Sequence, residues 1–313
     1  MKTNDFLRKY GIVFILLLLV IIFTLANRVF LTSSNLINIL RQISTLAIIT
    51  IGMSFVLISG GIDLSVGAQL SAVGVISATL IYHHNFNPLL GCFIGVGFAT
   101  FVGFLNGIFI SSTKVPPLIA TLATQQLLLG TGYIVSSGRN IYGLPASVKF
   151  LGQGYIGLIP IPVIIAIIVV IIGWFILNKA YLGRYFYAIG SNEEVARLSG
   201  IKTRKVKTVA YTLSGFMSGL AAIIMMARIN SGSPVVGKGF EMDVLTAAVL
   251  GGISISGGEG KVFGAIVGAL IIGVLSNGLI IINVSEYYQM IVKGLVLAFA
   301  IAFDSLSTSR YRN

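Results

Sequence analysis

Long apolar runs separated by short polar loops constrain this chain more than any other feature. A helix that crosses a bilayer needs about 20 mainly apolar residues, and shorter ones are tolerated when paired. Only 10% of the residues are charged, whereas soluble domains carry about a quarter. The sequence therefore predicts an all-α, polytopic membrane protein with a single transmembrane domain over residues 1–313. We expect about ten spans, near residues 10–26, 42–60, 64–82, 89–111, 116–136, 161–178, 208–228, 244–257, 262–283 and 287–305.

The distribution of Lys and Arg predicts the orientation of these spans. With the N-terminus inside, fourteen of the 21 basic residues lie on the inner side and seven on the outer side. Because cytoplasmic loops carry the excess of Lys and Arg, both termini and the polar segment 178–207 are predicted to be cytoplasmic, in a multi-pass protein of the inner membrane. The net charge of +12 does not indicate nucleic acid, since these residues lie in loops rather than on one soluble surface. The inner group includes Lys2, Arg8, Lys9, Arg310 and Arg312.

The polar segment predicts a short independent helix. Ser191 followed three residues later by Glu194 matches a capping box, and Gly200 offers a stop. Val195 and Leu198 share one face, which gives the helix an apolar side for packing and charged ends for a soluble partner. An ordinary basic loop of a polytopic protein is the alternative.

Four polar residues within or beside predicted spans are candidates for a substrate pathway. A charge there costs about 2.5–3.5 kcal/mol on insertion scales, so the two acids among them need a reason. Glycines around Asp63 let a helix break, which favours Asp63 as a buried N-cap of the next half-helix over direct ligand contact. The four candidates are Asp63, Asn106, Asp243 and Asn277.

The same four residues indicate a weak internal repeat. Asp63 is matched by Asp243, and Asn106 by Asn277, at similar offsets along the chain. Five predicted spans separate each pair, so the two copies would run in opposite directions across the bilayer. This pattern is typical of inverted repeats, which place a pathway at their interface. The expected repeats cover residues 42–136 and 208–305. Chance recurrence of Gly and Asn in membrane helices is the alternative.

The sequence contains no catalytic arrangement and no metal-binding spacing. His83 and His84 are adjacent in a short loop, and the single cysteine, Cys92, lies in an apolar run. The stretch GGISISGGEGK ends in Gly-Lys like a phosphate loop, but it lacks the upstream glycine and the following Ser or Thr of that motif. We therefore expect no enzymatic site, no metal and no cofactor in this chain.

The chain contains GIDLSVG, LGRYFYAIGSNEEVARLSGIKTRKVK, GFEMDVLTAAVLGG and YYQMIVK, in this order over nearly its whole length. These four blocks resemble the permease subunits of bacterial ribose-type sugar ABC importers. The resemblance implies a subunit that translocates a monosaccharide, such as ribose or a related sugar or polyol, across the inner membrane. It also implies a homodimer or a pair with a similar permease. An ABC ATPase subunit would hold ATP and Mg inside, and a periplasmic or lipid-anchored sugar-binding protein would dock outside.

The resemblance also implies that the polar segment couples the permease to the ATPase. Ser191 replaces the second glycine of the family pattern, at little cost because Ser is a good N-cap. A separate basic excess on the outer side is expected to meet acidic residues of the binding protein. The matching coupling residues are Gly190, Asn192, Glu193, Ala196, Arg197, Leu198 and Gly200, and the outer basic residues are Arg41, Arg139, Lys149, Arg228 and Lys238.

An ion-coupled secondary transporter is the alternative function, because inverted repeats and broken helices suit such carriers equally well. Such carriers rarely need a capped cytoplasmic helix, and they more often bury coupling carboxylates in mid-span, whereas the acids here cluster at span ends. An intramembrane enzyme would need catalytic groups that the sequence lacks. No residue distinguishes ribose from xylose, galactose or inositol as the substrate.

Overall fold

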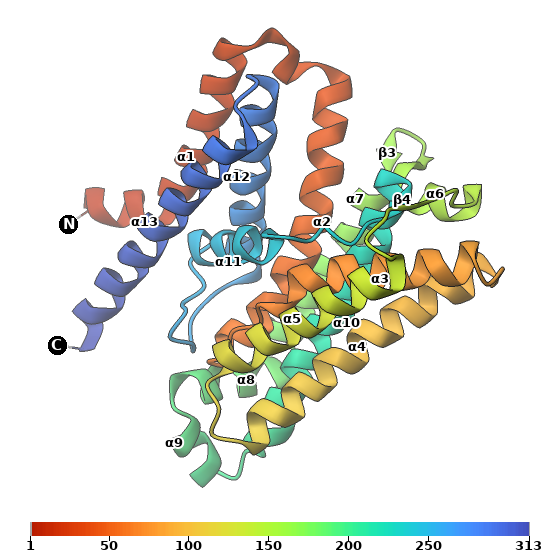
Figure 1. The fold of residues 1–313 in the computed structure, drawn as a ribbon. Helices are drawn as coiled ribbons and strands as arrows, with labels where there is room; N and C mark the ends of the chain where they lie inside the picture. Colours follow the sequence, from red (N-terminus) through yellow and green to blue (C-terminus); the bar gives the residue numbers. More distant parts are fainter. Residues whose placement is uncertain (1, 313) are drawn as a thin grey trace.

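The computed structural model describes the backbone of residues 2–312 and the side chains of residues 12–302 and 304. Its elements are almost all helical, which confirms the predicted all-α, polytopic class (Figure 1). Five basic side chains used to predict the orientation, Lys2, Arg8, Lys9, Arg310 and Arg312, lie outside the described side chains. Helices overlap each predicted span: α1 (Lys2–Ala26), α2 (Ser33–Ile58), α3 (Ser65–Tyr82), α4 (Pro88–Ser112), α5 (Pro117–Ser136), α7 (Ile161–Asn178), α10 (Thr203–Ile229), α11 (Phe240–Leu250), α12 (Val262–Ile281) and α13 (Glu286–Arg312). The shorter helices are η1 (Arg28–Leu31), α6 (Ala146–Gln153), α8 (Tyr181–Ser191) and α9 (Glu193–Leu198).

Seven of the described helices, α2, α3, α4, α5, α7, α10 and α12, are long and apolar enough to cross a membrane. Helix α11 differs because its 11 residues rise only about 16 Å, roughly half of a hydrocarbon core. The predicted span at 244–257 is therefore wrong in its second half, where residues 251–257 form turns and irregular chain. Two glycines end the helix, and the second, Gly252, has a φ of +79°, which favours glycine.

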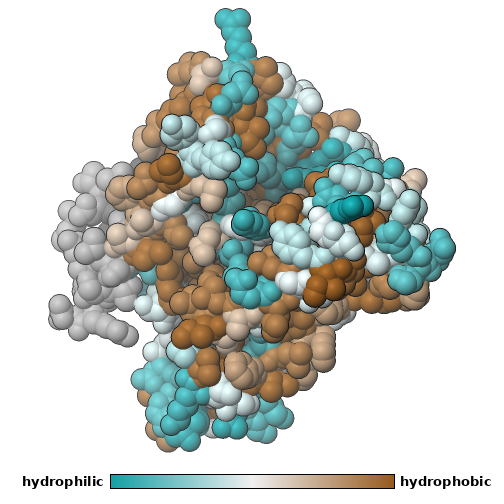
Figure 2. Space-filling model, in the orientation of Figure 1, coloured by the Kyte–Doolittle hydropathy of each residue, from teal (hydrophilic) through white to brown (hydrophobic). Residues whose placement is uncertain are grey.

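The helices form two groups beside α2 (Figure 1). Helices α1, α12 and α13 lie to one side of α2, and α3, α4, α5 and α10 lie to the other. Helices α2, α3, α10 and α12 are mostly buried, whereas α4, α5 and α7 are buried over only 22–33% of their most apolar stretch and carry many exposed apolar side chains. These exposed residues contribute to the hydrophobic surface in Figure 2, which suits a bilayer better than water.

Glycines bring α4 and α10 close together. Gly103 and Gly107 lie one turn apart on α4, and Gly215 and Gly219 have the same spacing on α10. A Cβ built on Gly103 would lie 2.3 Å from the backbone oxygen of Tyr211. Small residues at this spacing let membrane helices approach closely, so this crossing depends on the missing side chains.

Two short antiparallel ribbons shape the end of the molecule opposite α9 (Figure 1). Strand β1 (Ile141–Tyr142) pairs with β4 (Ser231–Gly232), which joins the loop after α5 to the loop after α10. Strands β2 (Tyr155–Ile156) and β3 (Ile159–Pro160) form a hairpin directly after α6. The ribbons thus hold the connecting loops at this end in fixed register.

Candidate coupling and pathway sites

The short helix in the polar segment, α9, begins one residue later than predicted. The Asn192 side chain accepts a hydrogen bond from the Val195 amide over 3.0 Å, and Asn192 has the extended backbone of an N-cap. Ser191 instead ends α8, whose last turn closes between the Asn192 amide and the Ala188 carbonyl. The predicted capping box at Ser191 is therefore wrong. Gly200, with a φ of +85°, follows the end of α9.

Helix α9 turns its two large apolar side chains away from the chain. Val195 is 57% exposed and Leu198 74% exposed, whereas the small Ala196 between them is buried. The apolar face that the sequence predicts for packing is thus not covered by any described part of this chain. Exposed apolar side chains bordered by charge are a feature of protein interaction sites.

The charged residues beside this apolar face form two ion pairs. Arg197 pairs with Glu194 over 2.5 Å at exposed positions, and the Arg197 guanidinium lowers the pKa of Glu194 by hydrogen bonding and by its charge. Glu193 pairs with Lys207, which lies in the first turns of α10. An exposed pair contributes little stability. The Glu193–Lys207 pair, however, links α9 directly to a long buried helix.

Close backbone contacts between glycines join α8 to two other segments. The Gly258 amide donates to the Ile58 carbonyl over 2.9 Å, and a Cβ built on Gly190 would lie 1.8 Å from the same oxygen. A Cβ built on Gly257 would lie 2.9 Å from the Cα of Gly60. We call Gly60, Gly190, Gly257 and Gly258 the glycine junction. It places the end of α8 against both the end of α2 and the loop after α11.

Asp63 anchors the start of α3. Its Oδ1 accepts hydrogen bonds from the backbone amide and the hydroxyl of Ser65, over 3.1 and 2.5 Å, and its Oδ2 accepts one from the Ser214 hydroxyl over 2.9 Å. Leu64 rather than Asp63 occupies the N-cap position, so the bond runs to the first residue of the helix. The carboxylate is fully buried, and each of its oxygens has a partner.

Asn106 shares this buried network. Its Nδ2 donates to the Ser65 hydroxyl over 3.2 Å, and its Oδ1 accepts from the Thr124 hydroxyl over 2.6 Å. Gln69 donates to the same Ser65 hydroxyl over 3.0 Å. Ser65 therefore lies at the centre of a polar cluster that joins α3, α4, α5 and α10.

Asp243 and Asn277 have separate partners. Asp243 pairs with Lys293 on α13 over 2.7 Å, and Asn277 exchanges two 3.0 Å hydrogen bonds with Asn35 on α2. No residue joins these two as Ser65 joins Asp63 and Asn106 in the described chain. The inverted repeats accordingly stay a prediction.

Glu241 is a buried acid that the sequence reasoning missed. Its Oε1 accepts a hydrogen bond from Gln125 on α5 over 2.8 Å, and a Cβ built on Gly67 would lie 2.1 Å from its Oε2. Gly67 therefore gives room for the carboxyl group against α3. The signal was present in the sequence, since Glu241 precedes Asp243 by two residues in the same acidic helix start.

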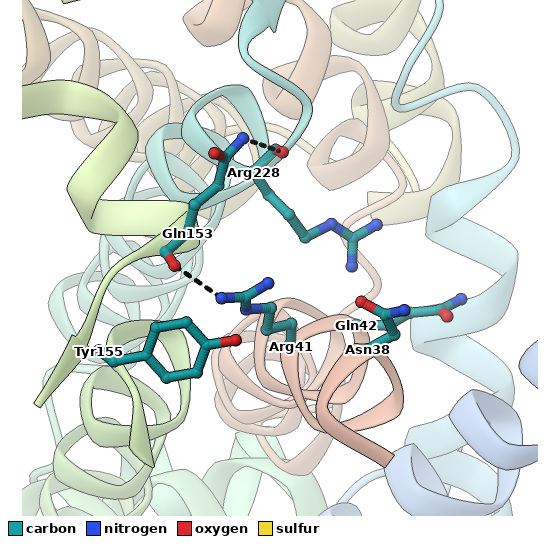
Figure 3. A pocket seen from close by; sticks show the side chains of 6 residues that line it. All are labelled: Asn38, Arg41, Gln42, Gln153, Tyr155 and Arg228. Carbon is teal, nitrogen blue, oxygen red and sulfur yellow. Dashed lines mark hydrogen bonds between the residues drawn. The ribbon is translucent and has the colours of Figure 1, made fainter. Parts of the chain in front are cut away.

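The five outer basic residues divide into two sets. Arg139, Lys149 and Lys238 lie on the loops and on α6, outside any described pocket. Arg41 and Arg228 come from α2 and α10 and line one polar pocket with a volume of about 550 Å³ (Figure 3). The sequence missed the other residues of this pocket, which are Asn38, Gln42, Gln153 and Tyr155. Gln42 carries a detectable signal, because an amide side chain is unusual in a predicted span such as 42–60, whereas Asn38 lies before that span.

No group of three or more His, Cys, Asp or Glu side chains that could hold a metal occurs among the described residues. Cys92 is buried. Neither observation adds a catalytic site to the contacts above.

Comparison with known proteins places the chain in a family. A family model described as branched-chain amino acid transport system / permease component matches residues 35–301. The ribose import permease protein of Bacillus subtilis is 41% identical over 95% of this chain and 93% of the relative. The corresponding protein of Escherichia coli K12 is 38% identical over 96% and 94%. The D-allose transport system permease protein of Escherichia coli K12 is 39% identical over 95% and 92%.

No solved structure matches the chain significantly. The family match covers most of the sequence, and it includes the broken segment at Asp63, the glycine junction and α9. This chain therefore belongs to the family of transport-system permease components.

Proposed function

We propose that this chain is the membrane-spanning permease of an ATP-driven ABC importer for a monosaccharide such as ribose or a related sugar. The observation that carries the proposal is the exposed apolar face of α9, joined through the glycine junction to the break between α2 and α3. A capped helix in this position suits the transfer of force from a separate motor protein. The ribose and allose permeases among its relatives support the substrate class.

The motor is an ABC ATPase subunit that binds ATP and Mg, since this chain carries no nucleotide motif. Val195 and Leu198 contact that subunit, while Glu193 passes its movement to α10 through Lys207. Gly190 passes the movement to the end of α2. The coupling residues expected from the sequence are Gly190, Asn192, Glu193, Ala196, Arg197, Leu198 and Gly200, and the exposure of Val195 adds it to them.

We propose that the domain has ten spans, that α11 is a half-span, and that both termini face the cytoplasm from the inner membrane. Two copies, or this chain and a similar permease, enclose one pathway, with inverted repeats meeting near it. Asp63, Asn106, Asp243 and Asn277 hold the broken helices in place around that pathway. Their side chains are already hydrogen-bonded within the chain, which supports this positioning role.

A sugar-binding protein, periplasmic or lipid-anchored, docks at the end opposite α9. Arg139 is exposed there and Lys149 is half-exposed, so their charges are available to acidic residues of that partner. Lys238 is also exposed, but the adjacent Gly237 packs against Gly67 near the start of α3. Arg41 and Arg228 lie deeper, in the pocket of Figure 3. Rim charges chiefly raise the association rate and its salt dependence.

Reconstitution tests this function. The chain is co-expressed with an ABC ATPase and a sugar-binding protein from the same organism, the complex is placed in proteoliposomes, and uptake of radiolabelled ribose, allose and xylose is measured. We expect uptake of one sugar that needs ATP and the binding protein and that survives ionophores. Uptake driven by an ion gradient without the ATPase would establish the secondary transporter instead.

A further inference from the structure

The pocket between α2, α10 and the α6–β2 turn is a polar cavity that neither the coupling contacts nor the exposed rim residues Arg139 and Lys149 use. It lies at the end opposite α9 (Figures 1 and 3). Its volume of about 550 Å³ falls within the range of small-molecule sites. Six polar or aromatic side chains from four elements, α2, α6, β2 and α10, line it, so its form does not depend on one flexible loop.

The contacts inside this pocket fix its walls and leave polar groups free for a ligand. Arg41 donates to the Gln153 carbonyl over 2.6 Å and lies 4.7 Å from the centre of the Tyr155 ring. Gln153 donates to the Arg228 carbonyl over 3.0 Å. The Nε of Arg41 is buried without a partner in the described chain. A buried donor without a partner is destabilising, and a ligand acceptor would satisfy it.

The mixture of donors and acceptors identifies the chemistry of the ligand. Neither Arg41 nor Arg228 pairs with a described carboxylate, which alone would suit an anion. The amides of Asn38 and Gln42 and the phenol of Tyr155, however, each offer an acceptor as well as a donor, and an anion, which only accepts, would leave those acceptors unused. A sugar hydroxyl both donates and accepts, so a neutral polyol satisfies both kinds of group.

A polar stripe on α2 continues inward from the pocket. Asn38, Gln42 and Thr45 lie on one face, spaced four and three residues apart. Thr45 is fully buried, and its hydroxyl has no hydrogen-bond partner among the described residues. This unpaired hydroxyl lies one turn farther along α2 than the pocket and points to a polar route past the cavity.

We propose that this pocket is a receiving subsite for a monosaccharide, which holds the sugar after its release from the binding protein and before it enters the pathway. The proposal rests on the proposed import function. Gln42 and Arg41 make the main contacts with sugar hydroxyls, and Arg228 closes the far wall. Binding here is weak, because the site has to pass the sugar onward.

The experiment compares Arg41→Gln and Gln42→Ala with wild type in the complete importer. Arg28→Gln is the matched control, since Arg28 is exposed on η1 outside the pocket. Each complex is assayed for the maximum uptake rate, the sugar concentration that gives half-maximal uptake, the affinity for the binding protein and the retention of the ATPase. Saturation-transfer NMR with the transported sugar detects direct binding to the complex without the binding protein.

We expect the maximum uptake rate to fall about fivefold in each pocket variant, the effect of losing one neutral hydrogen bond. The half-saturating sugar concentration stays unchanged, because the binding protein sets it. Affinity for the binding protein and ATPase retention also stay unchanged, and the NMR signal is lost. Arg28→Gln matches wild type throughout.

Three results would overturn the subsite. The first is unchanged maximum uptake in both pocket variants, and the second is an NMR signal suppressed by sulfate rather than by sugar. The third is a loss of binding-protein affinity equal to the loss of uptake, which would make the pocket a receptor for a carboxylate of that protein. A wild-type complex that transports no sugar would instead contradict the proposed function, so the two failures are distinguishable.

Discussion

Gly200 and Asp63 have roles in this chain that most other residues could not fill. Gly200 has a φ of +85°, and nothing lies within 4 Å of a Cβ built there. Glycine is therefore needed here for its backbone conformation, not to avoid a steric clash. Asp63, by contrast, is needed for its acceptors, which satisfy three donors in a buried site. These two positions give separate tests of coupling and of folding.

Replacing Gly200 with Val should weaken the end of α9 without disturbing the membrane helices. The left-handed conformation costs a side chain about 1–2 kcal/mol, and the β-branch of Val adds to that. We expect normal insertion, lost sugar uptake, and an ATPase that is either released or hydrolyses ATP idly. Gly200→Asn is the control, since Asn tolerates positive φ. Equal loss of uptake in both variants would mean that the glycine serves another purpose.

Replacing Asp63 with Ala should lower the stability of the purified protein. The change leaves the hydroxyls of Ser65 and Ser214 without their acceptor, at about 1–3 kcal/mol for each buried group. Asp63→Asn keeps a side-chain oxygen for Ser65, so it should unfold near the wild-type temperature. Thermal unfolding in detergent measures both. If Asn proves as damaging as Ala, the negative charge of Asp63, and not its position at the start of α3, is what matters.

Among the elements, α8 and α9 form the connection between the exposed face of α9 and the membrane helices. Helix α9 has six residues and is too short to be stable alone, so Ala196, the Glu193–Lys207 pair and the cap at Asn192 hold it in place. Its exposed Val195 and Leu198 contribute nothing to that packing and remain available to a partner.

Gly190→Ala should separate ATP hydrolysis from transport. The new Cβ would lie 1.8 Å from the Ile58 oxygen, so the end of α8 has to move away from α2. We expect the ATPase to remain bound and to hydrolyse ATP while uptake falls at least tenfold. Gly130→Ala on α5 is the matched control, because nothing lies within 4 Å of a Cβ there. Full uptake in Gly190→Ala would show that movement does not pass through the glycine junction.

The sequence predicts an element well when that element depends on neighbouring residues, and poorly when it depends on contacts between distant segments. Apolar runs predict membrane helices because each run is a local property, and α2, α3, α7 and α12 begin or end within a few residues of the expected positions. Contacts between distant segments leave weaker signals. The glycine junction and the pairing of Glu241 with Gln125 need the folded chain, and the cap at Asn192 competed with an equally suitable neighbour, Ser191.

At the scale of the whole molecule, the two ends differ in what they present. One end carries α9 and its charged border, and the other carries the ribbons, the polar pocket and exposed basic residues (Figures 1 and 2). Under the proposed function each end meets a different soluble partner, so the orientation of the chain in the membrane is part of that proposal.

The orientation is open to a direct test with reporter fusions. A cytoplasmically active reporter joined after Lys202 should be active, and the same reporter in the loop between Arg139 and Leu158 should be inactive, because the Lys and Arg excess lies on the side of α9. Immunoblots of both fusions control for expression. The opposite pattern of activities would reverse the membrane orientation and move the docking faces with it.

Cross-linking from the α9 face tests the central claim most directly. Cys92 is the single cysteine and is buried, so Leu198→Cys adds an accessible thiol for a benzophenone label. Leu158→Cys does the same at the opposite end, where Leu158 is 93% exposed. In the complete importer, light should join position 198 to the ATPase and position 158 to no ATPase. Cross-links to the ATPase from position 158, or none from position 198 in a complex that retains the ATPase and transports sugar, would contradict the account.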